Sequence, residues 1–191
     1  HPYKRNIESQ LLWIPQHEWE YSLDFKAEDY ILREDVIELV FEGLDTYADV
    51  WMNGKKILHA DNMFRTYSYD VKDIIKETNN IKIKFYPFDK ERDSLIETYP
   101  LRFPEKYAVM RKAAYQNGWD WAPRYMNMGI WQPVYLKAWT RSTICSASVI
   151  TNEIHDDKAD LFFEACVNAD VEHDITLQLF QENEKILDKN I

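Results

Sequence analysis

Polar and large apolar residues alternate along several segments of this chain, as they do in half-buried β-strands. Between residues 19 and 25, every second residue is aromatic or leucine and the residues between them are polar. The same pattern, together with short apolar runs, predicts strands over residues 19–25, 36–41, 46–52, 62–69, 81–86 and 130–139.

Two of the connections between these strands have recognisable turn chemistry. Residues 42–45 have the composition of a turn. Asn53 and Gly54 directly follow the third predicted strand, and Asn-Gly is the preferred centre of a type I′ turn because both residues tolerate positive φ. We therefore expect residues 55–59 to run back antiparallel as a hairpin.

The remaining connections are less regular. Asp70 can cap a short helix over residues 71–76. Residues 88–116 are charged and show no steady period, and they are too many for a simple connection in a compact β domain. They predict an insertion or functional loop, with a helical turn at 111–115.

The composition changes near residues 140–142, and three further strands are predicted over residues 144–151, 160–169 and 174–181. Three strands cannot close a sandwich, and no βαβ repeat occurs that would indicate a parallel barrel or a dinucleotide-binding sheet. We therefore predict an all-β chain with a complete β-sandwich over residues 1–140 and the opening of a second, truncated sandwich over residues 141–191.

Charge and hydropathy limit the classes of partner. The chain has 33 acidic and 23 basic residues and a formal net charge of -10, which disfavours a nucleic acid as partner. No apolar run approaches the roughly 20 residues that span a bilayer, so we expect no membrane partner. The chain starts at His1 rather than Met, which we interpret as processing or trimming; a periplasmic, extracellular or lysosomal location is favoured over the cytoplasm, with the compartment left open.

The cysteines and histidines predict no metal or cofactor site. The histidines show no zinc spacing, and two cysteines make no disulfide framework. Cys145 and Cys166 would lie opposite each other in a hairpin with its loop near residues 155–156. Few such pairs reach disulfide geometry, so we expect two free buried thiols, with a disulfide as the alternative.

The candidate binding chemistry lies in the Asn-Gly-Trp-Asp-Trp-Ala-Pro segment of residues 117–123. Indole faces stack on the apolar face of a pyranose, and a carboxylate accepts hydrogen bonds from sugar hydroxyls. Trp119, Asp120 and Trp121 are therefore the predicted substrate-binding residues. The alternative is two core tryptophans beside a surface aspartate, but the flanking Gly118 and Pro123 favour a shaped loop.

No catalytic residues are predicted. Retaining glycoside hydrolysis needs two carboxylates about 5 Å apart across the sugar, and nothing marks any two acidic residues here as such a pair. Arg111, Lys112 and Arg124 flank the tryptophan segment and could pair with Asp120, although a solvated basic face is the simpler interpretation for each of them.

The chain resembles the N-terminal region of β-mannosidases in glycoside hydrolase family 2. The resemblance covers nearly all of residues 1–140, and the Gly-Leu-Asp-Thr-Tyr-Ala-Asp-Val run with the Trp-Asp-Trp element is specific to the mannosidase branch. Two departures are Ala122, where a glycine is usual, and Gln132, where a basic residue is common. The matching segments are 19–21, 41–54, 60–65, 111–113, 118–123 and 129–131.

The resemblance implies a jelly-roll, galactose-binding-like domain, then an immunoglobulin-like domain, then a catalytic (β/α)8 barrel that carries both catalytic glutamates and lies outside this chain. It also implies that the loop with Trp119, Asp120 and Trp121 reaches the barrel and helps to form the subsite for a terminal β-mannose. On this interpretation the partners are terminal β-mannosides and the missing barrel, and the chain alone is inactive.

Three alternatives remain. The chain could be an autonomous carbohydrate-binding module. It could be the same domain from a β-galactosidase or β-glucuronidase relative. It could also be a structural spacer with Trp119 and Trp121 in its core.

Overall fold

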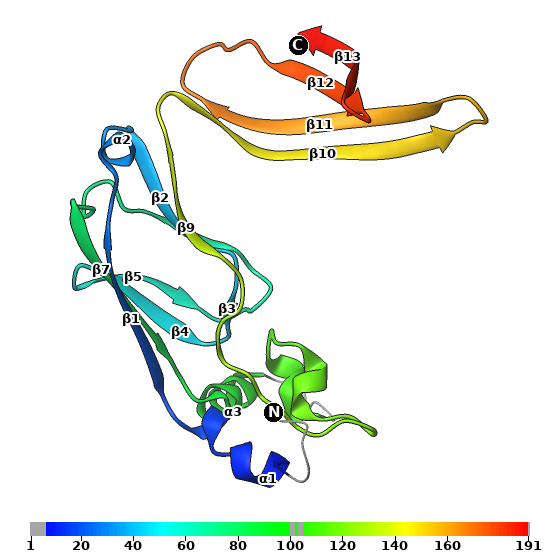
Figure 1. Cartoon of the computed structure of the whole chain (residues 1–191). Coiled ribbons are helices and arrows are strands. Elements are labelled where there is room, and N and C mark those ends of the chain that lie inside the picture. The colour runs from blue at the N-terminus through cyan, green and yellow to red at the C-terminus, as the bar shows by residue number, and fades with distance from the viewer. Residues whose placement is uncertain (1–6, 100–101, 103–104, 191) are drawn as a thin grey trace. The chain divides into compact units, whose positions relative to one another are not determined.

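The computed structural model describes residues 7–99, 102 and 105–190. The chain divides into two compact units, His1–Ala138 and Trp139–Ile191. The described residues are mainly strands (Figure 1), which confirms the predicted all-β class with sandwich-like sheets. The assignment of residues 1–140 to a jelly-roll domain and of 141–191 to a partial immunoglobulin-like domain stays a prediction.

The first unit is a sandwich of two main sheets. One sheet has the order β1-β7-β4-β5, the other has the order β6-β2-β9, and β3 pairs with β8 beside them. The strands are β1 (Trp19–Lys26), β2 (Val36–Phe41), β3 (Leu44–Asp45), β4 (Ala48–Met52), β5 (Lys55–Ala60), β6 (Tyr67–Asp70), β7 (Thr78–Phe85), β8 (Gly129–Ile130) and β9 (Val134–Trp139).

The core lies between these sheets, where the alternation seen in the sequence places one apolar face of each strand. Burial of these side chains is the main favourable contribution to folding of the unit. From β2, β4 and β7 the buried side chains are Ile37, Leu39, Phe41, Ala48, Val50, Met52, Ile81, Ile83 and Phe85.

The predicted hairpin at Asn53 and Gly54 is confirmed. The φ angles are 51° and 82°, and Met52 pairs with Lys55 across the turn. The Asn53 amide also donates to the Ile74 carbonyl at 2.8 Å and accepts from the Asn80 N–H at 2.9 Å. The turn therefore ties this hairpin to the neighbouring segments as well as reversing the chain.

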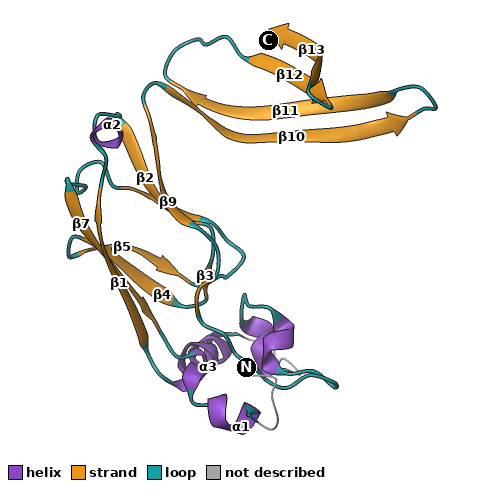
Figure 2. Cartoon of the chain, in the orientation of Figure 1, coloured by secondary structure: helices purple, strands orange, loops and turns teal. Residues whose placement is uncertain are grey.

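The insertion predicted over residues 88–116 contains more helix than the sequence suggested. It includes α3 (Phe88–Thr98) and the 3-10 turns η2 (Lys106–Val109) and η3 (Ala114–Asn117). This helix and these turns lie at the end of the first unit that also holds α1 (Glu8–Leu11) (Figure 2). A second apolar cluster formed by Tyr47, Phe88, Met110 and Met126 packs this end of the unit.

Three local predictions were wrong. Residues 62–66 are not part of a strand, because the Asn62 side chain accepts from the Phe64 N–H at 2.9 Å and bends the chain. Residues 71–76 form a turn rather than a helix, although Asp70 does accept from the Lys72 N–H. The strand predicted over 130–139 is interrupted between β8 and β9.

The connections between strands also differ in detail. Residues 44–45, predicted to lie in a turn, form β3. The N-terminal segment contains α1 and the 3-10 turn η1 (Ile14–Gln16), and α2 (Asp29–Leu32) follows β1. No helix within the described part of the chain combines the length and apolar character that crossing a membrane requires.

The second unit consists of two antiparallel hairpins, β10 (Ser142–Ile154) with β11 (Ala159–Ala169) and β12 (Thr176–Gln181) with β13 (Glu184–Asn190). β13 was not predicted. The hairpin around residues 155–156 is present, but Cys166 pairs with Ser146 because Cys145 lies in a bulge. Both thiols are free, as expected, and exposed rather than buried, because the two hairpins leave most of their side chains open to solvent.

Candidate functional site

The Trp-Asp-Trp element forms the tip of a tight turn. The backbone N–H of Trp119 donates to the Ala122 carbonyl and the N–H of Ala122 donates to the Trp119 carbonyl, both at 3.1 Å. This reciprocal pair leaves Asp120 and Trp121 as the two central residues. Gly118, with φ of 98°, precedes the turn and has the positive φ that glycine tolerates best.

The three predicted binding residues are accessible to a ligand. Trp121 is 82% exposed, Trp119 is 51% exposed, and Asp120 is exposed. The indole rings of Trp119 and Trp121 lie 5.8 Å apart at 70°, in an edge-to-face arrangement. Neither indole belongs to the core, which contradicts the burial of both indoles that the spacer alternative assumed.

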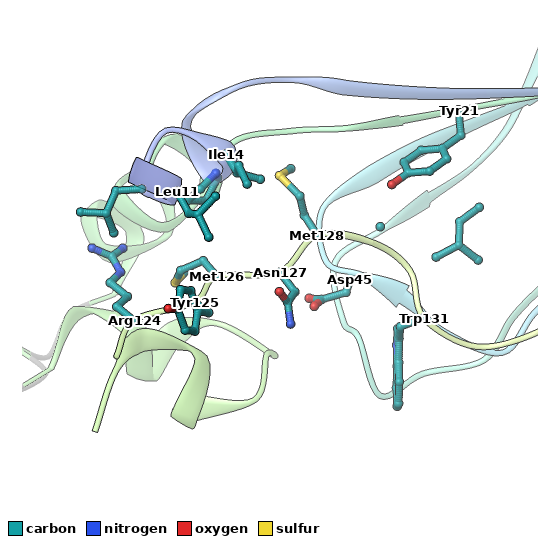
Figure 3. Close-up of a pocket in the computed structure, with 14 residues that line it drawn as sticks. Leu11, Ile14, Tyr21, Asp45, Arg124, Tyr125, Met126, Asn127, Met128 and Trp131 are labelled. Carbon is teal, nitrogen blue, oxygen red and sulfur yellow. The ribbon is translucent and has the colours of Figure 1, made fainter. Parts of the chain in front are cut away.

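A pocket of about 580 Å³ opens beside this loop, between the sandwich and the N-terminal turns (Figure 3). Tyr21 and Trp131 line the sandwich side, while Arg124 and Tyr125 line the opposite side. The lining is mostly apolar, with the Asp45 carboxylate and the Asn127 amide facing each other (Figure 3). The structure does not bring Trp119, Asp120 or Trp121 into the lining of this pocket.

Trp131 is held on the sandwich side of the pocket by close packing. Its indole N–H donates to the Met63 carbonyl at 2.9 Å. A Cβ atom at Gly43 would lie only 2.3 Å from the Trp131 Nε1 atom, so the glycine leaves room for the ring. At Gly129, with φ of 142°, a Cβ would lie 2.9 Å from the Tyr21 hydroxyl.

The strongest electrostatic feature is a buried ion pair that joins β3 to the insertion. The Lys112 Nζ atom lies 2.5 Å from the Asp45 Oδ1 atom, and the side chains are 0% and 4% exposed. The ammonium also lies 4.4 Å from the centre of the Phe88 ring. Burial lowers the pKa of Lys112 to about 8, although the charge of Asp45 and its hydrogen bond raise it in part.

This ion pair corrects the suggestion that Lys112 pairs with Asp120. Among the described residues, Asp120 makes no ion pair with any of its three basic neighbours. Arg111 contributes its backbone carbonyl to the Met63 N–H, and Arg124 contributes its backbone N–H to the Glu8 carboxylate. The basic residues around the turn therefore do not fix the orientation of Asp120 directly.

The sequence did not predict that Asp45, Lys112 and Gln116 form a connected group. The Gln116 amide donates to the Asp45 Oδ2 atom at 3.3 Å. Asp45 and Lys112 lie in segments that resemble β-mannosidases, and this resemblance was the only feature of the sequence that pointed to them. Their side chains meet across 67 positions of sequence, which no local pattern reveals.

One exposed cluster in the second unit has metal-ligand chemistry. Glu153, His155 and Asp160 place one potential ligand atom each within 4.8 Å of one another. The His155 Nε2 atom is 3.5 Å from a Glu153 carboxylate oxygen and 3.6 Å from an Asp160 carboxylate oxygen, and all three side chains are exposed. Exposed acidic groups commonly gather in this way without a metal ion.

Comparison with known proteins identifies the family to which the first unit belongs. The sequence profile described as "Glycosyl hydrolase 2 galactose-binding domain-like" matches residues 1–132. The chain belongs to this family. The family assignment confirms the resemblance to the N-terminal region of family 2 glycoside hydrolases.

The relatives of this family 2 domain include β-mannosidases. The chain is 31% identical to the β-mannosidase of Mus musculus over 150 residues, which covers 72% of this chain and 17% of that protein. It is 27% identical to the Bos taurus β-mannosidase over 225 residues, covering 97% of this chain and 26% of that protein. The chain therefore spans about a quarter or less of the relatives that it matches.

A solved structure agrees with these relatives. The crystal structure of a β-D-mannosidase from Dictyoglomus thermophilum superposes with a TM-score of 0.89 and 27% identity, covering all of this chain and 24% of that one.

Proposed function

We propose that this chain is the non-catalytic N-terminal part of a retaining family 2 glycoside hydrolase that removes terminal β-D-mannose residues from the non-reducing end of oligosaccharides. The exposed Trp119-Asp120-Trp121 turn is the observation that carries the proposal. The similarity to β-mannosidases supports the substrate class. The chemistry itself would take place in a (β/α)8 barrel outside this chain, and we expect the 191 residues alone to be inactive.

The role of the turn follows from its exposure and chemistry. Asp120 would accept hydrogen bonds from sugar hydroxyls, and the two indoles would form the wall of the subsite. Because the turn leaves most of the Trp121 ring open to solvent, a second surface is needed to enclose a sugar. Enclosure by the barrel would fix the sugar and exclude water at the reacting centre.

The proposal is tested by kinetics on the full-length enzyme. A hydrogen bond to a charged group contributes about 1.5–3 kcal/mol, so Asp120→Ala should lower kcat/KM for an aryl β-mannoside about 10- to 100-fold. The matched control is Asp73→Ala, which removes another exposed aspartate of the first unit and should leave turnover unchanged. Wild-type turnover by Asp120→Ala would remove the assigned role.

An autonomous carbohydrate-binding module is the second candidate, favoured by the accessibility of both indoles. A titration of the isolated chain with mannose oligosaccharides separates the two functions. Half of a subsite should bind very weakly, whereas a module should bind measurably without the barrel. Relative turnover of β-mannosides, β-galactosides and β-glucuronides by the full-length enzyme distinguishes the mannosidase from its relatives.

A further inference from the structure

The carboxylate of Asp45 is a buried anchor for two side chains of the insertion. Its Oδ1 atom accepts from the Lys112 ammonium at 2.5 Å, and its Oδ2 atom accepts from the Gln116 amide at 3.3 Å. The Thr46 hydroxyl also donates to Oδ1. Asp45 itself is fixed in β3, where it pairs with Gly129 of β8. The two insertion side chains are therefore tied to the sandwich scaffold at one point.

The same two side chains hold the backbone of Asn127 from both sides. The Lys112 ammonium donates to the Asn127 backbone carbonyl at 2.6 Å, and the Asn127 backbone N–H donates to the side-chain Oε1 atom of Gln116 at 3.0 Å. Residues 116 and 127 are the two ends of the loop 117–126, which carries the Trp-Asp-Trp turn. The loop is thus closed at its base by side chains rather than by a strand ladder.

Burial strengthens these contacts. Lys112, Gln116 and Asp45 are all buried, and hydrogen bonds to charged groups in such surroundings are stronger than those at the surface. Inside the loop, the reciprocal pair between Trp119 and Ala122 shapes only the tip. The C-terminal half of the loop is held by the bond from the Arg124 N–H to Glu8 and by the buried Met126, and the contacts of residues 116 and 127 hold its base.

We propose that Asp45, Lys112 and Gln116 form a clamp that positions the loop 117–126, so that Trp119, Asp120 and Trp121 are presented in one fixed geometry. The three clamp residues are positioning residues, because they act through the loop and do not themselves contact sugar. The catalytic consequence of the clamp rests on the proposed function, while its effect on the loop does not.

Hydrogen exchange of the full-length enzyme tests the clamp without reference to activity. Gln116→Met keeps a side chain of similar length and removes both hydrogen bonds of Gln116, while leaving the buried ion pair intact. Exchange of the loop amides, including those of Trp119 and Ala122, should become at least tenfold faster. Exchange in β4 and β7 should stay within twofold of wild type.

Lys112→Met is the second variant and should increase loop exchange further. The matched control is Gln178→Met on β12, an exposed glutamine of the second unit, which should leave loop exchange unchanged. Unchanged loop exchange in Gln116→Met would overturn the clamp. An equal increase in the loop, β4 and β7 would also overturn it, because that result indicates a general loss of stability.

Kinetic measurements then test whether the clamp affects turnover of the sugar substrate. Gln116→Met should lower kcat/KM for an aryl β-mannoside at least fivefold, and adding it to Asp120→Ala should cause no further loss, because both changes remove the same contact. A loosened loop with wild-type kcat/KM would overturn the positioning role. If Asp120→Ala itself retained full turnover, the proposed function would fail, while hydrogen exchange would still decide the clamp.

Discussion

The buried ammonium of Lys112 makes a quantitative prediction about stability and pH. Its pKa is lowered to about 8, mainly by burial, whereas a lysine in an unfolded chain has a pKa of about 10.4. Between these values the unfolded state binds more protons than the folded state. The free energy of unfolding should therefore rise with pH in this window, because the cost of burying the charge disappears as Lys112 loses its proton.

The size of the effect follows from the two pKa values. Each pKa unit corresponds to about 1.4 kcal/mol, so the total gain is about 3 kcal/mol, most of it between pH 8 and pH 10.5. The reference is the double variant Asp45→Asn/Lys112→Met, which removes both charges of the pair. The difference in free energy of unfolding between wild type and reference should grow by that amount over the window.

Urea unfolding at several pH values measures this difference. Tryptophan fluorescence follows the first unit, because six of the seven tryptophans lie in it. Lys90→Met, an exposed lysine of α3, corrects for the general effect of removing one positive charge. A difference that stays constant or shrinks as the pH rises would refute the reasoning that burial dominates over the attraction of Asp45.

Two further predictions concern the sandwich. Gly54→Ala should destabilise the first unit by about 1 kcal/mol through its positive φ alone, since nothing lies within 4 Å of the added Cβ. Asn53→Ala should destabilise the unit more, because it also removes hydrogen bonds to neighbouring segments. Equal losses of unfolding free energy in urea would contradict this prediction. Burial raises the pKa of Asp49, but hydrogen bonds from Lys56, His59 and Tyr86 outweigh it and leave that pKa below its usual value. The stability advantage of wild type over Asp49→Asn should therefore be full above about pH 4 and disappear as the pH falls through the lowered pKa, and an advantage independent of pH in acid unfolding would exclude this role.

The alternating pattern predicted most strands of the first unit because their side chains are sorted between core and solvent. The pattern failed at residues 62–66, where a hydrogen bond from the Phe64 N–H to the Asn62 side chain overrides the alternation. It also failed at α3, a charged helix that depends on tertiary packing. Phe88, at its start, is 1% exposed and belongs to the second apolar cluster.

The candidate site could be predicted only in part. Trp119, Asp120 and Trp121 were found because their chemistry is contained in three adjacent residues. Their accessibility depends on the tight turn that the structure describes, and their role in sugar binding stays a proposal. The clamp could not be predicted, because a buried lysine resembles a surface lysine in sequence and its partner Asp45 is remote along the chain.

The proposed function requires that Asp120 accepts a hydrogen bond from a hydroxyl of the bound sugar. The most direct measurement is a cycle that combines wild type and Asp120→Ala of the full-length enzyme with aryl β-mannosides that each lack one hydroxyl. For the hydroxyl that Asp120 binds, the 10- to 100-fold effect of the substitution on kcat/KM should vanish. An effect of the same size with every deoxy substrate would contradict the account.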